Sequence, residues 1–122
     1  MNRSVLLGRA AAFGFFVNLV LHTSAVGPVS RTATQASKDI GAVMPVLWLG
    51  LSGAFFILGV VVLLHAHQSA PQRKPVLVLA GLFPLGIAVG QYLTLGWIFP
   101  ELTLGLTGLL TIAGALTAPA IA

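Results

Sequence analysis

The sequence predicts an all-α integral membrane protein, in which four transmembrane helices form a bundle with short loops. Composition is the first reason: 57% of the 122 residues are hydrophobic and 7% are charged, whereas about 25% are charged in soluble domains. A soluble domain of this size cannot hide so much apolar surface, because its surface is large relative to its volume. Patterning is the second reason: FFILGVVVLL at 55–64 is continuously apolar, whereas strands of a membrane barrel alternate apolar and polar residues.

Four apolar stretches are long enough to cross a bilayer, which needs about 20 residues per helix. We expect the spans at about 5–26, 40–66, 75–97 and 102–122, within a single membrane domain that covers residues 1–122. The second span is longer than the hydrocarbon requires, so it should tilt or project beyond it. Because the connections are short, consecutive helices should be antiparallel neighbours.

The segments between the spans carry residues typical of loops and helix ends. GPVSRTATQASK at 27–38 is polar and rich in Ser and Thr, so we interpret it as a linker in which Ser37 caps the second span. HQSAPQRKP at 67–75 contains two prolines and reads as the second loop. Pro84 falls in the middle of the third span, where it should kink the helix and free the carbonyl of Ala80.

The basic residues lie near the ends of the spans and not in one patch. The net charge of +4 therefore indicates membrane anchoring, and we exclude nucleic acid as a partner. The N-terminal end and the second loop carry Arg3, Arg9, Arg73 and Lys74, whereas the opposite side carries Arg31 and Lys38. This asymmetry favours cytoplasmic positions for both termini, and we expect a bacterial inner membrane protein.

Small residues form rows on three of the expected helices. In lipid, helices associate through close backbone approach and hydrogen bonds, so glycine and threonine mark contact faces. We expect packing within the bundle, with a homo-oligomer contact or another membrane subunit as the alternative. The glycines assigned to helix packing are Gly50, Gly53, Gly86, Gly90, Gly105 and Gly108.

Polar residues within the spans gather on the side opposite Arg73. Antiparallel threading brings this set to one depth, and Gly14, Asn18 and His22 recur at four-residue spacing on one helix face. We favour a structural hydrogen-bond network as the role of these residues. A ligand site is the second interpretation, and catalysis with His22 as base is the third. The candidate ligand-binding residues are Asn18, His22, Trp48, Gln91, Tyr92, Glu101 and Thr103.

Metal and thiol chemistry find little support in the sequence. The chain has no cysteine, which excludes disulfides and thiolate catalysis. No His and carboxylate residues recur at the spacings of known metal motifs, so we predict no metal site and identify no cofactor. The lack of catalytic spacing favours a protein that is not an enzyme.

In length and number of spans the chain is similar to the small multidrug transporters. That family carries a membrane-embedded acidic residue in the first helix. The span 5–26 contains no acidic residue here, and both carboxylates, Asp39 and Glu101, fall near span ends. This departure argues against proton-coupled drug export.

Three classes of function remain open. The short loops, the small-residue rows and the absence of catalytic spacing favour a non-catalytic accessory or assembly subunit of a membrane complex. A binder of a lipid, quinone or isoprenoid in the outer half of the bundle, or an enzyme acting on it, is the second class. A small oligomeric channel or transporter is the third, although its pore would need polar residues along a whole helix. Membrane lipids are partners in every case.

Overall fold

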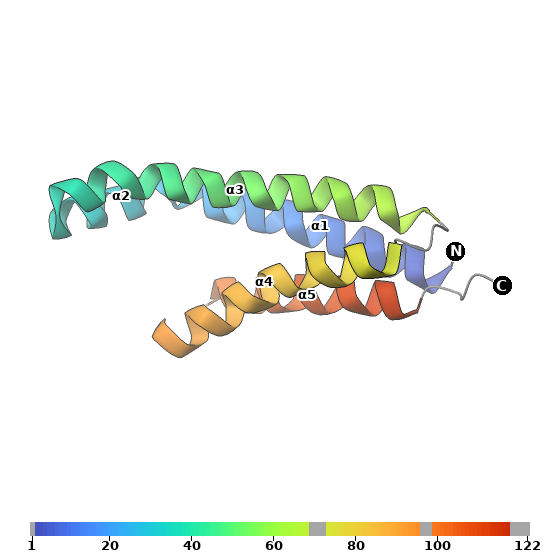
Figure 1. Cartoon of the computed structure of the whole chain (residues 1–122). Helices are drawn as coiled ribbons and strands as arrows, with labels where there is room; N and C mark the ends of the chain where they lie inside the picture. The colour runs from blue at the N-terminus through green and yellow to red at the C-terminus, as the bar shows by residue number, and fades with distance from the viewer. Residues whose placement is uncertain (1, 69–72, 96–98, 118–122) are drawn as a thin grey trace.

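The chain folds into helices, and the predicted fold class is confirmed. The computed structural model describes residues 2–68, 73–95 and 99–117. Four of the helices in this part of the chain are long and apolar enough to cross a membrane, and a shorter helix lies between the first two of them. In chain order (Figure 1) the helices are α1 (Arg3–Ser24), α2 (Val26–Ala36), α3 (Lys38–Ala66), α4 (Arg73–Leu95) and α5 (Phe99–Leu116).

Each long helix begins two or three residues before the span that the sequence predicts. The predicted ends at 96–97 and 118–122 lie outside the described residues. Ser37 occupies the N-cap position of α3 with an extended backbone, as predicted, but its side chain makes no cap hydrogen bond. Pro84 is fully buried inside α4, and α3 contains a second internal proline, Pro45.

The prediction of a linker at 27–38 was wrong, because most of this segment forms α2. Pro28 sits in the first turn of α2, where its missing N–H costs no intrahelical hydrogen bond. The hydroxyls of Ser30 and Thr34 donate to the carbonyls four residues earlier, at 2.6 and 2.8 Å. These bonds give the two hydroxyl groups acceptors within the helix.

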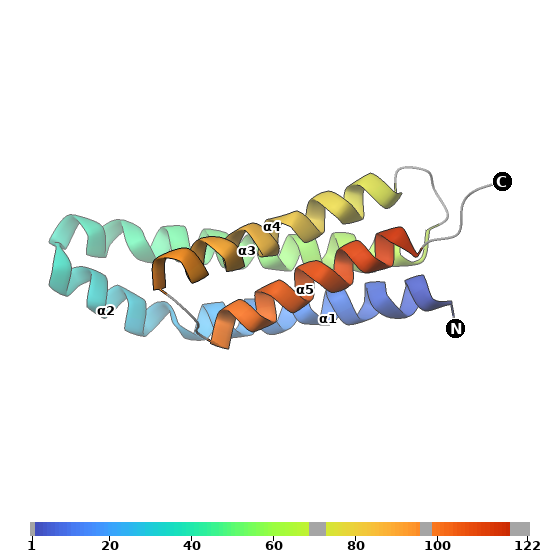
Figure 2. The same ribbon diagram turned by 90° about the horizontal axis from the view of Figure 1, so that it is seen from below.

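The helices form two hairpins that meet along α1. In the first hairpin, α1 and α2 pack antiparallel to α3, and in the second, α4 packs against α5. The face of α1 not covered by α3 packs against α5, which joins the hairpins, while α3 and α4 make few contacts (Figure 2). The buried apolar core follows this arrangement and contains Ala11, Ala12, Phe15, Phe55, Val62, Leu77, Ala80, Ala88, Leu104 and Ala115.

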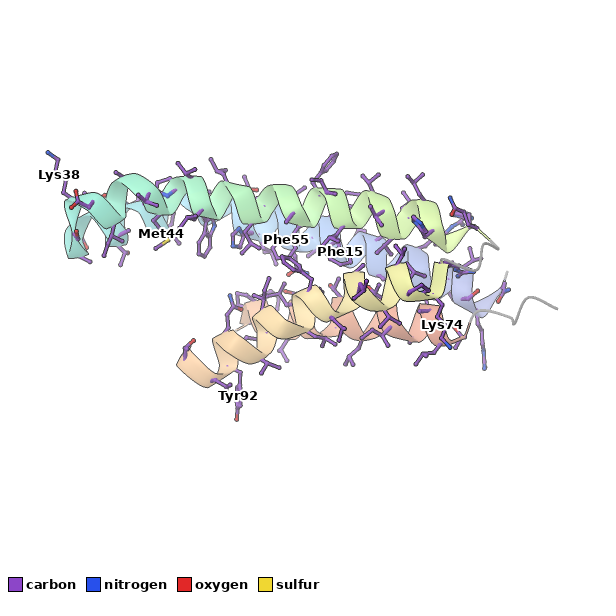
Figure 3. All side chains as sticks on the ribbon, viewed as in Figure 1. Phe15, Lys38, Met44, Phe55, Lys74 and Tyr92 are labelled. Carbon is purple, nitrogen blue, oxygen red and sulfur yellow. The ribbon has the colours of Figure 1, made fainter. Side chains whose placement is uncertain are left out.

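The first hairpin is longer than a bilayer is thick. Helices α1 and α2 contain 22 and 11 residues and are separated by Ala25 alone. Helical segments of this combined length extend about 50 Å, compared with about 30 Å for the hydrocarbon layer. The tip formed by α2 and the start of α3 extends past α4 and α5 (Figures 1 and 3). Its exposed polar residues are Arg31, Thr32, Thr34, Gln35, Lys38 and Asp39.

Glycines set the distance between the helices of each pair. Where α4 meets α5, a methyl group added at Gly81 would lie 2.8 Å from the carbonyl oxygen of Gly108. A methyl group added at Gly108 would lie 2.7 Å from the carbonyl oxygen of Gly81. Gly8 makes a similar close approach to Ala66 where α1 meets α3. Such contacts place backbone against backbone, which is how helices associate in lipid.

We predict that Gly81→Ala lowers the free energy of unfolding by about 1–3 kcal/mol, because the added methyl group overpacks the crossing of α4 and α5. Reversible unfolding in mixed micelles, followed by circular dichroism, measures this change. Gly105→Ala is the matched control, since no described heavy atom lies within 4 Å of a methyl group there. Equal stability of the two variants would contradict a tight crossing at Gly81.

Candidate functional site

Asn18 joins the two hairpins through hydrogen bonds from α1 to α5. Its side-chain nitrogen donates to the Thr107 hydroxyl at 3.0 Å and lies 3.3 Å from the Thr103 carbonyl. The Thr103 hydroxyl donates to the Asn18 side-chain oxygen at 2.7 Å. Gly14, one turn earlier on α1, makes room for this contact, because a methyl group there would collide with the Thr107 hydroxyl.

The amide of Asn18 makes hydrogen bonds to protein groups through both its nitrogen and its oxygen. Besides the contacts to α5, its nitrogen donates to the Gly14 carbonyl at 2.9 Å. Both amide hydrogens therefore have acceptors, and the oxygen has a donor. The side chain is buried, so these bonds offset the desolvation of a polar group in the membrane. Asn18 and Thr103 lie together as expected, joined by hydrogen bonds within the protein.

His22 lies against α3 and not beside Asn18. Its ring stacks on Trp48, with the ring centres 3.9 Å apart and the planes at 7°. The indole nitrogen of Trp48 donates to the His22 carbonyl at 2.5 Å, and a hydrogen bond of 3.0 Å joins His22 Nδ1 to the Ser52 hydroxyl. Phe55 meets the His22 ring edge-on, with the centres 5.6 Å apart.

The prediction that Gly14 and His22 share one helix face was too simple. An α-helix turns once in about 3.6 residues, so a residue eight positions along is rotated by about 80°. This rotation directs Gly14 and Asn18 to α5, and His22 to α3.

One nitrogen of His22 faces no hydrogen-bonding group. Nε2 is buried and has no hydrogen-bond partner among the described residues. The Ser52 hydroxyl also lies 3.1 Å from the Trp48 carbonyl, to which it donates. When Ser52 uses its hydrogen in that bond, it accepts from His22 Nδ1–H, and Nε2 is then an unprotonated acceptor.

The other candidate residues lie on α4 and α5. Glu101 is 4% exposed and lies in the first turn of α5, a position where the helix dipole stabilises a carboxylate. Gln91 and Tyr92 are near the end of α4 that diverges from α3. Tyr92 is 46% exposed, and its ring points away from the other helices (Figure 3). The structure therefore divides the predicted cluster between the α1–α5 contact, the α1–α3 contact and the end of α4.

Sequence reasoning did not single out Ser52 or the burial of Arg73. Ser52 is one turn from Trp48 on the same face of α3, a spacing that could have indicated it. Arg73 was assigned to a surface loop, but it is buried at the start of α4. No sequence signal marks that burial, because it depends on how the helix ends come together.

The six predicted packing glycines fall into two groups. Gly108 lies in the close crossing with α4. The other five have no described heavy atom within 4 Å of an added methyl group, and they are Gly50, Gly53, Gly86, Gly90 and Gly105. These five glycines therefore make no close helix contact within the part of the chain that the structure describes.

No set of three or more His, Asp or Glu side chains suited to a metal ion comes together among the described residues. No protein-family model matches the sequence, and the searches of curated proteins and of solved structures found no similar chain. Function is therefore argued from the geometry.

Asn18→Leu should lower the free energy of unfolding by about 1 kcal/mol, the usual size of an interhelical hydrogen-bond contribution in membranes. The loss is modest because the Thr103 hydroxyl has a second acceptor within reach, the Pro100 carbonyl at 2.8 Å, and the Thr107 hydroxyl donates to the Thr103 carbonyl at 2.6 Å. A double-mutant cycle with Thr103→Val, measured by unfolding in micelles, should give a favourable coupling energy. Thr94→Val is the control, since Thr94 bonds back within α4, and coupling of the same size there would contradict the assignment.

Trp48→Phe should destabilise the protein by about 0.5–1.5 kcal/mol through loss of the indole hydrogen bond. Trp48→Leu should lose about 0.5–1.5 kcal/mol more, because it also removes the stacked ring. In NMR spectra the His22 ring protons should lie upfield through the ring current of Trp48 and move downfield in Trp48→Leu. The ring protons of His65 serve as the internal control. If the His22 chemical shifts were the same in the wild-type chain and in Trp48→Leu, the stacked pair would be ruled out.

Proposed function

We propose that the chain is a non-catalytic subunit of a membrane complex and that it binds a transmembrane helix of another protein along the groove between α3 and α4. The observation that carries this proposal is the open side of the bundle, where these helices make few contacts. A groove of about 500 Å³ lies there, and its lining is almost wholly apolar. The lining residues are Ala54, Ile57, Leu58, Val61, Val76, Leu79, Ala80 and Phe83.

The faces that line the groove continue into glycines towards the end where α3 and α4 diverge. On α3, Gly50 is one turn before Ala54 on the same face. On α4, positions 76, 79, 83, 86 and 90 follow the alternating three- and four-residue spacing of a helix contact face. Gly50, Gly86 and Gly90 have no described heavy atom within 4 Å of an added methyl group.

A partner helix explains these glycines better than a lipid chain does. In lipid, apolar side chains gain little by leaving the acyl chains, and helices associate where small residues permit close backbone contact. A lipid chain gains no such contact from glycine. Within this chain the α4–α5 crossing uses Gly81 and Gly108 in the same way. The glycines beside the groove therefore favour a helix as the occupant.

The interior polar groups fit a structural role in such a subunit. The side chain of Asn18 forms hydrogen bonds that join α1 to α5. The groove between α3 and α4 has little polar surface with which to bind a polar substrate or an ion. A channel would need polar side chains along the path, and catalysis would need a placed acid or base. These features favour a binding role over transport or catalysis.

A second candidate is a binder of a lipid, quinone or isoprenoid at His22. The observation that favours it is the buried Nε2 atom without a hydrogen-bond partner, which would accept from a hydroxyl on an otherwise apolar ligand. If this candidate is correct, extraction in mild detergent should co-purify one discrete small molecule. His22→Leu should lose that molecule, and Gly86→Leu should retain it.

We also propose that the end of the bundle with Arg3 and Lys74 faces the cytoplasm of a bacterium, following the excess of basic residues there. The α2–α3 tip would then project on the opposite side of the membrane.

The double variant Gly86→Leu/Gly90→Leu should reduce recovery of a protein partner on the order of tenfold, since the added side chains block backbone approach along α4. Affinity purification from the native membrane, followed by native mass spectrometry, measures the recovery. The single variants Gly105→Leu and His22→Ala are controls that should keep the partner. Unchanged partner recovery in the double variant would refute the groove as the contact surface. If the recovered partner were a second copy of this chain, the complex would be a homo-oligomer.

A further inference from the structure

A buried guanidinium lies at the start of α4. Arg73 is the first residue of this helix and is only 7% exposed. Its Nη1 atom donates to the carbonyl of Gln68 at 3.2 Å. Its Nε and Nη2 atoms are buried and have no hydrogen-bond partner among the described residues. These two nitrogens share one edge of the planar group and direct parallel N–H bonds the same way.

A guanidinium in this position requires a negative partner. Arginine stays protonated in proteins, and a buried charge without a counterion costs several kcal/mol. The position raises the cost, because the N-terminus of a helix is the positive end of its dipole. A single carbonyl at Gln68 supplies only part of the compensation.

The described residues supply no carboxylate at this end of the protein. The N-terminus of α1, the C-termini of α3 and α5, and the start of α4 all lie there (Figures 1 and 2). Arg3 and Arg9 in the first part of α1, and Lys74 near the start of α4, add positive charge at the same end. Both carboxylates of the sequence are elsewhere: Asp39 lies at the tip of the first hairpin, and Glu101 lies at the start of α5.

We infer that the Nε and Nη2 edge of Arg73 binds a phosphate group, and that the phosphate belongs to the headgroup of an anionic phospholipid. Two parallel N–H donors match two oxygens of a phosphate. Helix ends in a membrane protein lie at the depth of the headgroups, where anionic lipids attract basic residues. Arg73 is then a lipid-binding residue as well as the start of a helix.

The test measures binding of phosphatidylglycerol to the full chain in zwitterionic micelles. Native mass spectrometry counts the lipids retained, with phosphatidylcholine as the competitor, and circular dichroism gives the melting temperature. The wild-type chain should prefer phosphatidylglycerol and melt at a higher temperature in its presence. Arg73→Gln should weaken this preference on the order of tenfold to a hundredfold. Lys74→Gln removes the same formal charge from an exposed neighbour and should change the preference little.

The remaining outcomes separate the alternatives. Stabilisation of the wild-type chain by inorganic phosphate to the same extent would assign the site to free phosphate. Equal binding of both lipids by the wild-type chain would overturn the inference, and this comparison needs no variant to fold. A preference that survives in Arg73→Gln but disappears in Lys74→Gln would also overturn it. The isolated chain is used throughout, so the result does not depend on the partner proposed for the groove.

Discussion

The contact between α1 and α5 holds the two halves of this protein together, and the hydrogen bonds of Asn18 lie within it. Each hairpin is an antiparallel pair that the short chain connections favour. Nothing in the apolar faces alone decides how the hairpins meet, because lipid competes for those faces equally well. The amide of Asn18 fits at one place only, where Thr103 and Thr107 supply its partners and Gly14 leaves the space.

Joining the hairpins along α1 leaves the opposite side of the bundle open. Helix α1 uses two faces, one for α3 and one for α5, so α3 and α4 become the outer members, and they diverge towards the end of α4 (Figure 1). The phenylalanines Phe55 and Phe83 meet between them, with ring centres 6.1 Å apart. Beyond this contact the two helices present apolar side chains and glycines to the membrane. The proposed binding of a partner helix follows from this geometry.

The two ends of the bundle differ in charge and in depth. The end with the N-terminus brings arginines and a lysine together, with Arg73 buried among the helix ends. The other end carries both carboxylates and a helical tip that is longer than the hydrocarbon needs. The proposed orientation places the more basic end at the cytoplasmic lipid surface. Two proposals therefore depend on the attraction between basic residues and anionic lipid headgroups. One is the phosphate at Arg73, and the other is the cytoplasmic position of that end.

The sequence by itself determined that the chain is helical, that four helices can cross a membrane, and roughly where each begins, because length and hydropathy act locally along the chain. It also predicted that Asn18 and Thr103 would lie together. It did not predict that most of 27–38 is helical, since Ser and Thr are more typical of loops and helix caps than of helix interiors. Tertiary structure alone decided which neighbouring helix each polar residue of α1 contacts. It separated His22 from Asn18, buried Arg73, and left Gly86 and Gly90 open. These outcomes depend on helix rotation and pairing, and glycine in a contact looks the same in sequence as glycine facing lipid.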